Sequence, residues 1–216
     1  KRFFDGLYMA DVENALWRRG FIKRTQNLPD FDRIVVAVDP AVSSDVGSDE
    51  TGIMVVALGT DGYGYVLEDG SDRMRPEEWA RKAIALYDKY DADRIVAEVN
   101  QGGEMVEATI RAQAPGRTIP YRAVHATRGK VVRAEPIASL YELGKVYHAD
   151  EFGNLEDQMC VFTTGFDRKA QGWSPDRVDA LVWGLTDLFP QMVKKKTPET
   201  PIHIPPRQSL GASRRF

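Results

Sequence analysis

Apolar residues fall into two kinds of run along this chain, and the first kind is continuous and rich in β-branched residues. One such run occupies residues 33–39 and ends in Asp39, and a second, residues 52–58, follows a polar loop. Continuous apolar runs of this length are typical of strands covered on both faces. A third strand is expected at residues 63–67, because Asp61-Gly62 between apolar runs is a strong hairpin signal. Three antiparallel strands are therefore predicted to open the fold.

Beyond residue 75 the pattern alternates between helical and strand periodicity. Helices are predicted over residues 76–90 and 104–114, and strands over residues 94–99 and 120–124. Alternation at this spacing implies right-handed crossovers and parallel pairing. The prediction is an α/β fold with a mixed sheet of five or more strands, three antiparallel and then parallel, flanked by helices.

The two ends of the chain have less regular patterns. Residues 9–20 have a helix-like pattern, and two later helices are predicted over residues 131–143 and 175–189. The last segment contains a lysine run, several prolines and two terminal arginines, a composition typical of mobile tails. The predicted organisation has three segments, namely a linker arm at 1–31, a folded domain at 32–190 and a flexible C-terminal tail at 191–216.

Composition places the chain among ordinary globular proteins. Of its 216 residues, 43% are apolar and 28% charged, which fits one domain with a sizeable core. Cys160 is the only cysteine, so no internal disulfide or cysteine-rich zinc site can form, and a reducing cytoplasm is expected. No apolar run of about eighteen residues occurs, so no membrane partner is expected. The tryptophans are expected to be core or interface anchors.

The net charge of the chain bears on whether it binds nucleic acid. The chain carries a formal charge of −3, which gives no support for nucleic-acid binding, since that usually requires a basic excess. The objection weakens if acidic residues gather at a metal site, because bound metal ions would neutralise carboxylates where a polyanion approaches.

Two strand ends carry candidate metal ligands. Asp39 lies at the carboxyl end of the first predicted strand, where side chains can converge on a ligand, although an aspartate that starts a turn before Pro40 is an alternative. Glu98 lies inside an apolar strand, where an unpaired carboxylate is costly unless something positive binds it. A salt bridge to a nearby arginine is the alternative to metal binding at Glu98.

The last predicted helix supplies a third acid. At about 100° per residue, Asp179 lies on the rim of the apolar face and Asp176 almost opposite it. Asp179 is therefore the better ligand candidate, and Asp176 is interpreted first as a favourable charge at the helix start and second as an auxiliary ligand. An all-oxygen set suits magnesium or manganese, and two such ions can hydrolyse a phosphodiester.

Two further groups of charged residues have functional and non-functional explanations. The loop acids could add an outer ligand or could simply form a solvated loop; they are Asp45, Asp49 and Glu50. The basic residues at the start of a predicted helix could bind DNA phosphates, and a solvated helix end explains them equally well; they are Arg128, Lys130 and Arg133.

Five stretches in a fixed order resemble the nuclease domain of tailed-phage large terminase subunits, of the ribonuclease H-like superfamily. They are VDPA (38–41), DETGI (49–53), AEVNQGG (97–103), KVVRAEP (130–136) and SPDRVDALVW (174–183). The resemblance implies a ribonuclease H-like fold and an endonuclease that cleaves concatemeric viral double-stranded DNA with two Mg²⁺ or Mn²⁺ ions. It places the catalytic acids on Asp39, Glu98 and Asp179.

The resemblance also implies partners and leaves rivals. The implied partners are double-stranded DNA, an ATPase domain joined through the linker arm, a portal and a small terminase subunit, in the host cytoplasm. The domain alone is expected to be monomeric, and it carries no Walker A loop for ATP hydrolysis. Alternatives are another ribonuclease H-like nuclease, such as a Holliday-junction resolvase, and a non-catalytic capsid or portal docking module. A sugar-kinase-like fragment would need a second domain that this length does not provide.

Overall fold

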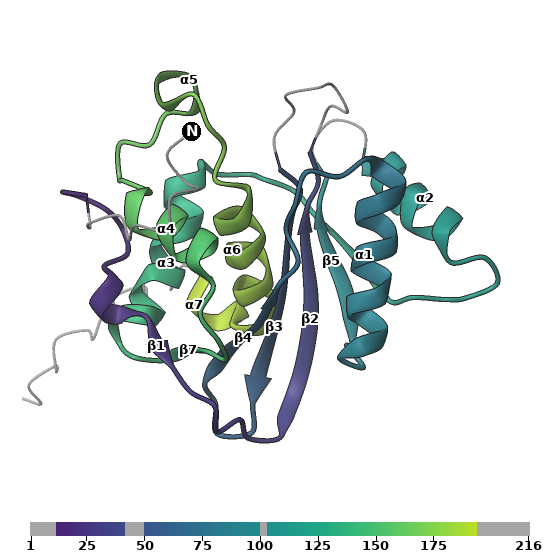
Figure 1. Ribbon diagram of the computed structural model, residues 1–216, viewed down its shortest axis with the longest axis horizontal. Helices are drawn as coiled ribbons and strands as arrows, with labels where there is room; N and C mark the ends of the chain where they lie inside the picture. Colours follow the sequence, from purple (N-terminus) through teal and green to yellow (C-terminus); the bar gives the residue numbers. More distant parts are fainter. Residues whose placement is uncertain (1–11, 42–49, 100–102, 194–216) are drawn as a thin grey trace, which may run out of the picture.

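A seven-stranded mixed sheet is the centre of the protein (Figure 1). The computed structural model describes residues 12–41, 50–99 and 103–193. The strands, in the order in which they lie in the sheet, are β1 (Lys23–Arg24), β7 (Val146–His148), β4 (Gly64–Asp69), β3 (Gly52–Gly59), β2 (Phe31–Asp39), β5 (Arg94–Glu98) and β6 (Tyr121–Val124). The helices are η1 (Arg19–Phe21), α1 (Pro76–Lys89), α2 (Gly103–Gln113), α3 (Lys130–Glu142), α4 (Gly153–Val161), α5 (Arg168–Gln171), α6 (Asp176–Leu188) and α7 (Pro190–Val193).

Strand directions follow the sequence pattern. Strands β2, β3 and β4 pair antiparallel, and β2, β5 and β6 pair parallel, so the predicted mixed sheet is confirmed. In register, Asp39 lies opposite Gly52, and Val38 lies opposite Ala97. Asp39 and Glu98 are the next residues along two neighbouring parallel strands. They therefore end those strands at the same edge of the sheet.

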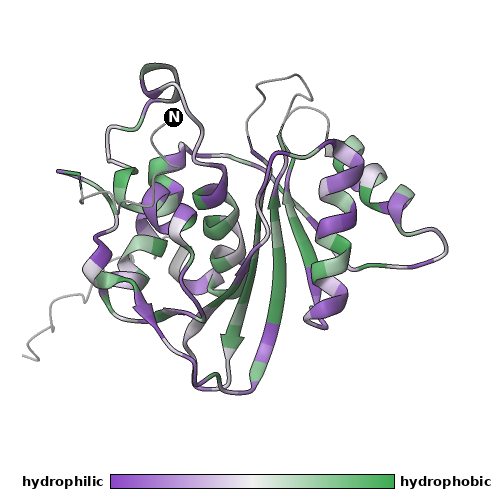
Figure 2. Ribbon diagram, in the orientation of Figure 1, coloured by the Kyte–Doolittle hydropathy of each residue, from purple (hydrophilic) through white to green (hydrophobic). Residues whose placement is uncertain are grey.

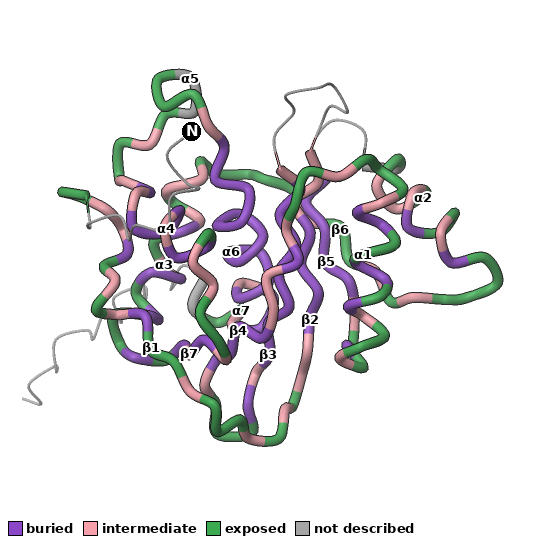
Figure 3. Tube along the Cα trace, viewed as in Figure 1, coloured by how far each residue is buried: buried purple, intermediate pink, exposed green. Residues whose placement is uncertain are grey.

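Helices cover both faces of the sheet, which gives two separate cores (Figures 1 and 3). Val36 and Val38 of β2 pack with α1 in one core, whereas Val35 packs with α6 in the other. Neighbouring side chains of a strand point to opposite faces. Asp39 therefore follows Val35 and Ala37 in facing α6, and by the same alternation on β5 so does Glu98. The central strands are coloured mostly hydrophobic in Figure 2.

Helix α6 lies unusually close to the sheet, because two glycines leave room for it. A Cβ atom added at Gly52 would lie 2.0 Å from the carbonyl oxygen of Asp176, and one at Gly184 would lie 2.6 Å from Val56. The helix start thus touches the strand residue that pairs with Asp39. This contact brings the first turn of α6 to the end of β2.

The N-terminal segment differs from its prediction. Among the described residues, 12–20 form no α-helix: Asn14 has a φ of 65°, and a short 3-10 helix begins at Arg19. Trp17 is fully buried against Tyr141 and Phe162. Tertiary packing of this ring overrides the local helical pattern. From Val12 onward the described part of the segment therefore packs onto the domain.

The far edge of the sheet was also not predicted. Strand β7 has three residues and β1 has two, and the two pair parallel to each other. Helix α4 fills the stretch that the sequence left irregular. Beyond Val193, the predicted tail lies outside the described residues. No helix among the described residues has the length and hydropathy needed to cross a bilayer.

Candidate metal centre

Three carboxylates lie within electrostatic range of one another where β2, β5 and α6 come together, and we call Asp39, Glu98 and Asp179 the acid cluster. Glu98 and Asp179 are 6% and 4% exposed, and Asp39 is half-buried. Burial raises the pKa of Asp39 well above its usual value, and the nearby Asp179 and Glu98 carboxylates raise this pKa further. The structure thus brings together the three acids that the sequence singled out. Their role as ligands stays a prediction.

Two cations from α3 face the acid cluster. Lys130 donates to Oδ2 of Asp179, and the Arg133 guanidinium lies 3.2 Å from Oε2 of Glu98 and 3.5 Å from Oδ1 of Asp179. Burial lowers the pKa of Lys130, but Asp179 and Asp39 outweigh it and the net shift is upward. Burial likewise raises the pKa of Asp179 despite the opposing effect of Lys130 and Arg133. Positive charge therefore compensates the acids only in part.

This placement changes what the three basic candidates can do. Arg128 is exposed and lies two residues before the start of α3. Lys130 and Arg133 instead turn toward carboxylates, and the Arg133 side chain is only 10% exposed. The salt bridge to an arginine that competed with metal binding at Glu98 is present in the structure. Of the three, only Arg128 lacks a carboxylate partner among residues 12–41, 50–99 and 103–193, so it could bind a phosphate without first leaving an acid.

The donor chemistry of the acid cluster fits a hard divalent cation. Carboxylate oxygens are the ligands that Mg²⁺ and Mn²⁺ prefer, and no thiolate or imidazole from the described residues joins the cluster. Within the described residues, no three or more acidic, histidine or cysteine side chains are already grouped as a metal-binding set. Glu98 and Asp179 contact Arg133 and Lys130 instead. Metal binding would require the contact between Lys130 and Asp179 to rearrange.

Asp176 lies closer to the acid cluster than the helical rotation suggested. It is 7% exposed, and its charge contributes to the raised pKa of Asp39. Its position in the first turn of α6 also places it near the positive end of the helix dipole. Both interpretations offered by the sequence, a helix-start charge and an auxiliary ligand, are compatible with this place.

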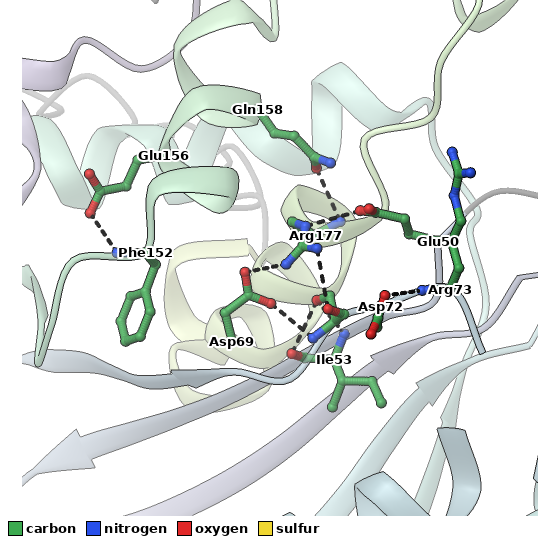
Figure 4. Close-up of polar contacts among 10 residues, drawn as sticks. Glu50, Ile53, Asp69, Asp72, Arg73, Phe152, Glu156, Gln158 and Arg177 are labelled. Atoms are coloured by element: carbon green, nitrogen blue, oxygen red, sulfur yellow. Dashed lines mark hydrogen bonds and ion pairs between the residues drawn. The ribbon is translucent and has the colours of Figure 1, made fainter. Parts of the chain in front are cut away.

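A buried arginine that sequence reasoning missed fixes the start of α6 (Figure 4). The Arg177 side chain donates to Glu50 at 3.0 Å, to Asp69 at 2.5 Å and to the carbonyl of Ser71 at 3.2 Å. Glu50, predicted to be an outer ligand or a solvated acid, is thus paired with Arg177. Asp45 and Asp49 lie outside the described residues. The arginine ties α6 to the end of β4 beside the acid cluster.

Trp183 also takes part in the site. Its Nε1–H donates to Oε2 of Glu98 at 2.5 Å, and the Arg133 guanidinium lies 4.5 Å from its ring centre. The sequence predicted only a core or interface role. The available signal was its spacing, because Asp179 and Trp183 are four residues apart and share one face of the helix.

The sequence and the fold were compared with known proteins. Residues 36–188 match the family described as Terminase RNaseH-like domain. No curated protein sequence matches the chain.

Solved structures with a similar fold include terminase nuclease domains from three viruses. The nuclease domain of the large terminase subunit gp2 of bacterial virus Sf6 has a TM-score of 0.58 at 14% identity, over 78% of this chain and 96% of that one. The large terminase nuclease of thermophilic phage G20c with bound magnesium has a TM-score of 0.57 at 16% identity, over 81% and 98%. The manganese-soaked human cytomegalovirus terminase nuclease domain has a TM-score of 0.50 at 14% identity, over 76% and 88%. These likenesses show the ribonuclease H-like fold.

Proposed function

The chain belongs to the family of terminase RNaseH-like domains, and on that premise we propose that it is a Mg²⁺- or Mn²⁺-dependent endonuclease that cuts double-stranded viral DNA during packaging. The observation that carries the proposal is the acid cluster, in which three carboxylates from β2, β5 and α6 lie within mutual electrostatic range. A cluster with this excess of negative charge at the carboxyl ends of strands is suited to cations.

The ligands would be Asp39, Glu98 and Asp179. When bound, two divalent ions would activate a water and stabilise the leaving oxygen of a phosphodiester. The magnesium and manganese present in the G20c and cytomegalovirus nucleases support this choice of metal. The chain itself holds the ligands on two strands and a buried helix, which are rigid elements. Lys130 would have to move off Asp179 as the ions enter.

DNA binding by the domain alone is expected to be weak and salt-sensitive. The net charge is −3, and of the three proposed phosphate-binding residues only Arg128 lacks a carboxylate partner within the described part of the chain. Few phosphate contacts mean low affinity, and salt screens each of them. Sequence preference should be small, because readout needs side chains that reach base edges.

Help from partners would then raise the local DNA concentration. We propose that an ATPase domain, a portal and a small terminase subunit hold DNA near the nuclease in the host cytoplasm, as the family resemblance implies. Tethering of this kind raises the effective concentration without any new contact.

The proposal is tested with the purified chain and supercoiled plasmid, linear duplex and a four-way junction, each with Mg²⁺ or Mn²⁺ across a salt series. Metal-dependent cutting of plasmid and duplex is expected, and it should vanish in Asp39→Asn and Asp179→Asn. Asp88→Asn serves as the matched control, because Asp88 is an exposed residue of α1 that pairs with Arg117. Selective cutting of the junction would point to a resolvase, and an absence of cutting together with an absence of metal binding would leave a docking module.

A further inference from the structure

We infer that Arg133 and Trp183 are positioning residues, which together hold the Glu98 carboxylate in the orientation that a metal ion needs. The inference rests on the proposed metal-dependent function. It concerns two side chains outside the predicted set of ligands, and neither would touch the ion itself.

Both residues donate to the same oxygen of Glu98. The Trp183 Nε1–H lies 2.5 Å from Oε2, and Nη1 of Arg133 lies 3.2 Å from it. The two donors come from different helices, α6 and α3. Two hydrogen bonds on one oxygen from fixed directions restrict rotation of the carboxylate about its terminal bond. Partners of this kind, beyond the ligands themselves, commonly orient the ligands of a metal ion.

Arg133 is held in place at some cost to its own hydrogen bonding. Its guanidinium stacks over the Trp183 ring at 4.5 Å, and its Nη2 reaches Asp179 at 3.5 Å. Its Nε is buried without a hydrogen-bond partner among the described residues. A buried donor left without a partner costs free energy. The position of the Arg133 side chain is therefore set by its contacts with Glu98, Asp179 and the Trp183 indole.

Helix periodicity explains how two helices can provide both ligand and support. On α6, Asp179 and Trp183 are four residues apart, and on α3, Lys130 and Arg133 are three apart. Residues at these spacings share one helix face. The proposed ligand Asp179 and the Trp183 indole that donates to Glu98 therefore move together as parts of α6.

Trp183→Phe isolates the positioning effect. This change keeps the ring under Arg133, most of the buried apolar area and the net charge, and it removes the N–H donor. We expect affinity for Mn²⁺ to fall by roughly tenfold, the lower end of the range for such supporting partners. Arg133→Lys, which keeps the charge but loses the planar fork and the stacking, should weaken binding in the same direction. Trp79→Phe on α1 is the matched control, because Trp79 is buried on the other face of the sheet.

The test uses isothermal titration of the whole chain with MnCl₂, together with ¹⁵N NMR of the tryptophan side chains in the metal-free protein. The Trp183 indole N–H should resonate downfield, as a strong donor, and should move in E98Q, whereas the Trp79 signal should not. Unchanged Mn²⁺ affinity in W183F and R133K, with affinity lost in D39N, would overturn the inference and leave the proposed function standing. Wild-type Mn²⁺ affinity in D39N would instead overturn the metal site itself.

Discussion

Two buried groups of charges lie on the α6 side of the sheet, and they deal with burial in opposite ways. In the acid cluster, burial and neighbouring carboxylates raise the pKa of Asp39. In the second group, which we call the histidine cluster, Glu156 is fully buried, but contacts with His148 and Arg24 outweigh that burial and lower its pKa. Helix α3 contacts both groups, with Lys130 at its start and Tyr141 near its end.

The histidine cluster is a closed chain of partners. The Tyr141 hydroxyl is hydrogen-bonded to Nε2 of His148 at 2.9 Å, and Nδ1 of His148 is hydrogen-bonded to Oε1 of Glu156 at 3.0 Å. Arg24 donates to the other carboxylate oxygen of Glu156, Oε2. Arg19 lies 3.6 Å from the same oxygen. Positive and negative groups are matched, so Glu156 is stable as a carboxylate.

The acid cluster is not matched in this way. Asp39, Glu98 and Asp179 face two cations, and Asp176 adds to the negative charge that Asp39 experiences. Both groups contain buried acids, so burial alone does not mark a functional site. What separates them is the excess of carboxylates over cations in the acid cluster, which a proton or a bound cation would offset.

The largest expected effect is on cleavage. Asp39→Asn should abolish metal-dependent DNA cutting, because it removes a proposed ligand, and should raise the melting temperature of the metal-free protein by relieving carboxylate repulsion. Plasmid nicking and thermal melting in EDTA measure the two effects. Cutting at the wild-type rate in this variant would contradict the proposed catalytic role of the acid cluster.

Removing an acid from the histidine cluster should have the opposite effects, with lower stability and unchanged cleavage. Glu156→Ala should lower the free energy of unfolding by about 3 kcal/mol, at the lower end for a broken buried pair, because Arg24 is 40% exposed and can be partly rehydrated. Cleavage per folded molecule should not change. Urea denaturation gives the free energy, and the exposed Glu142→Ala on α3 is the control. A loss below about 0.5 kcal/mol, the range of ordinary surface changes, would contradict the structural role.

Metal should stabilise the protein only through the acid cluster. At a Mn²⁺ concentration of about 100 Kd, linkage adds about 2.7 kcal/mol to the free energy of unfolding. Glu156→Gln should keep this increment, and Asp179→Asn should lose it. Denaturation curves with Mn²⁺ and with EDTA give the increment for each variant. Equal increments in all variants would show that the ion binds elsewhere.

The smallest effect is the pH dependence of the histidine cluster. Burial lowers the pKa of His148, and the net shift of Glu156 is also downward. Both groups therefore contribute stability above their unfolded pKa values, about 6.5 and 4.3, and lose it as the pH falls through the folded values. The groups that face them are Arg24, Arg19, Asp157 and Tyr141.

Urea denaturation in EDTA between about pH 7 and pH 4, the interval that spans these unfolded values, should show stability that declines with acid. In Glu156→Gln the decline below the unfolded pKa of a glutamate should be smaller. If Glu156→Gln loses as much stability as wild type when the pH falls, other groups cause the decline in the free energy of unfolding.

The central strands and the acid cluster could be predicted because their signals are local or periodic. The continuous run ending in Asp39 marks a covered strand, and its parallel pairing with β5 follows from the crossover through α1. Glu98 stood out because it interrupts an apolar strand. Asp179 stood out because helical rotation places it at the edge of an apolar face.

Other features depend on contacts between distant segments. Strands β1 and β7 are too short to carry a pattern and exist through pairing with β4. The direction of Lys130 and Arg133 depends on the packing of α3 against α6, because a helix start can equally face solvent. The N–H of Trp183 found its acceptor on β5, 85 residues away in sequence. No local pattern holds that information.

The docked N-terminal segment gives the domain a mechanical anchor. The Trp17 indole is enclosed by Tyr141 and Phe162, and Lys23–Arg24 pairs with β7 at the sheet edge. A pull on the chain ahead of Val12 would load this ring and this strand pair first. Three strands lie between β1 and β2, so the anchoring strand pair at this edge is separated by three strands from the strand that ends in Asp39.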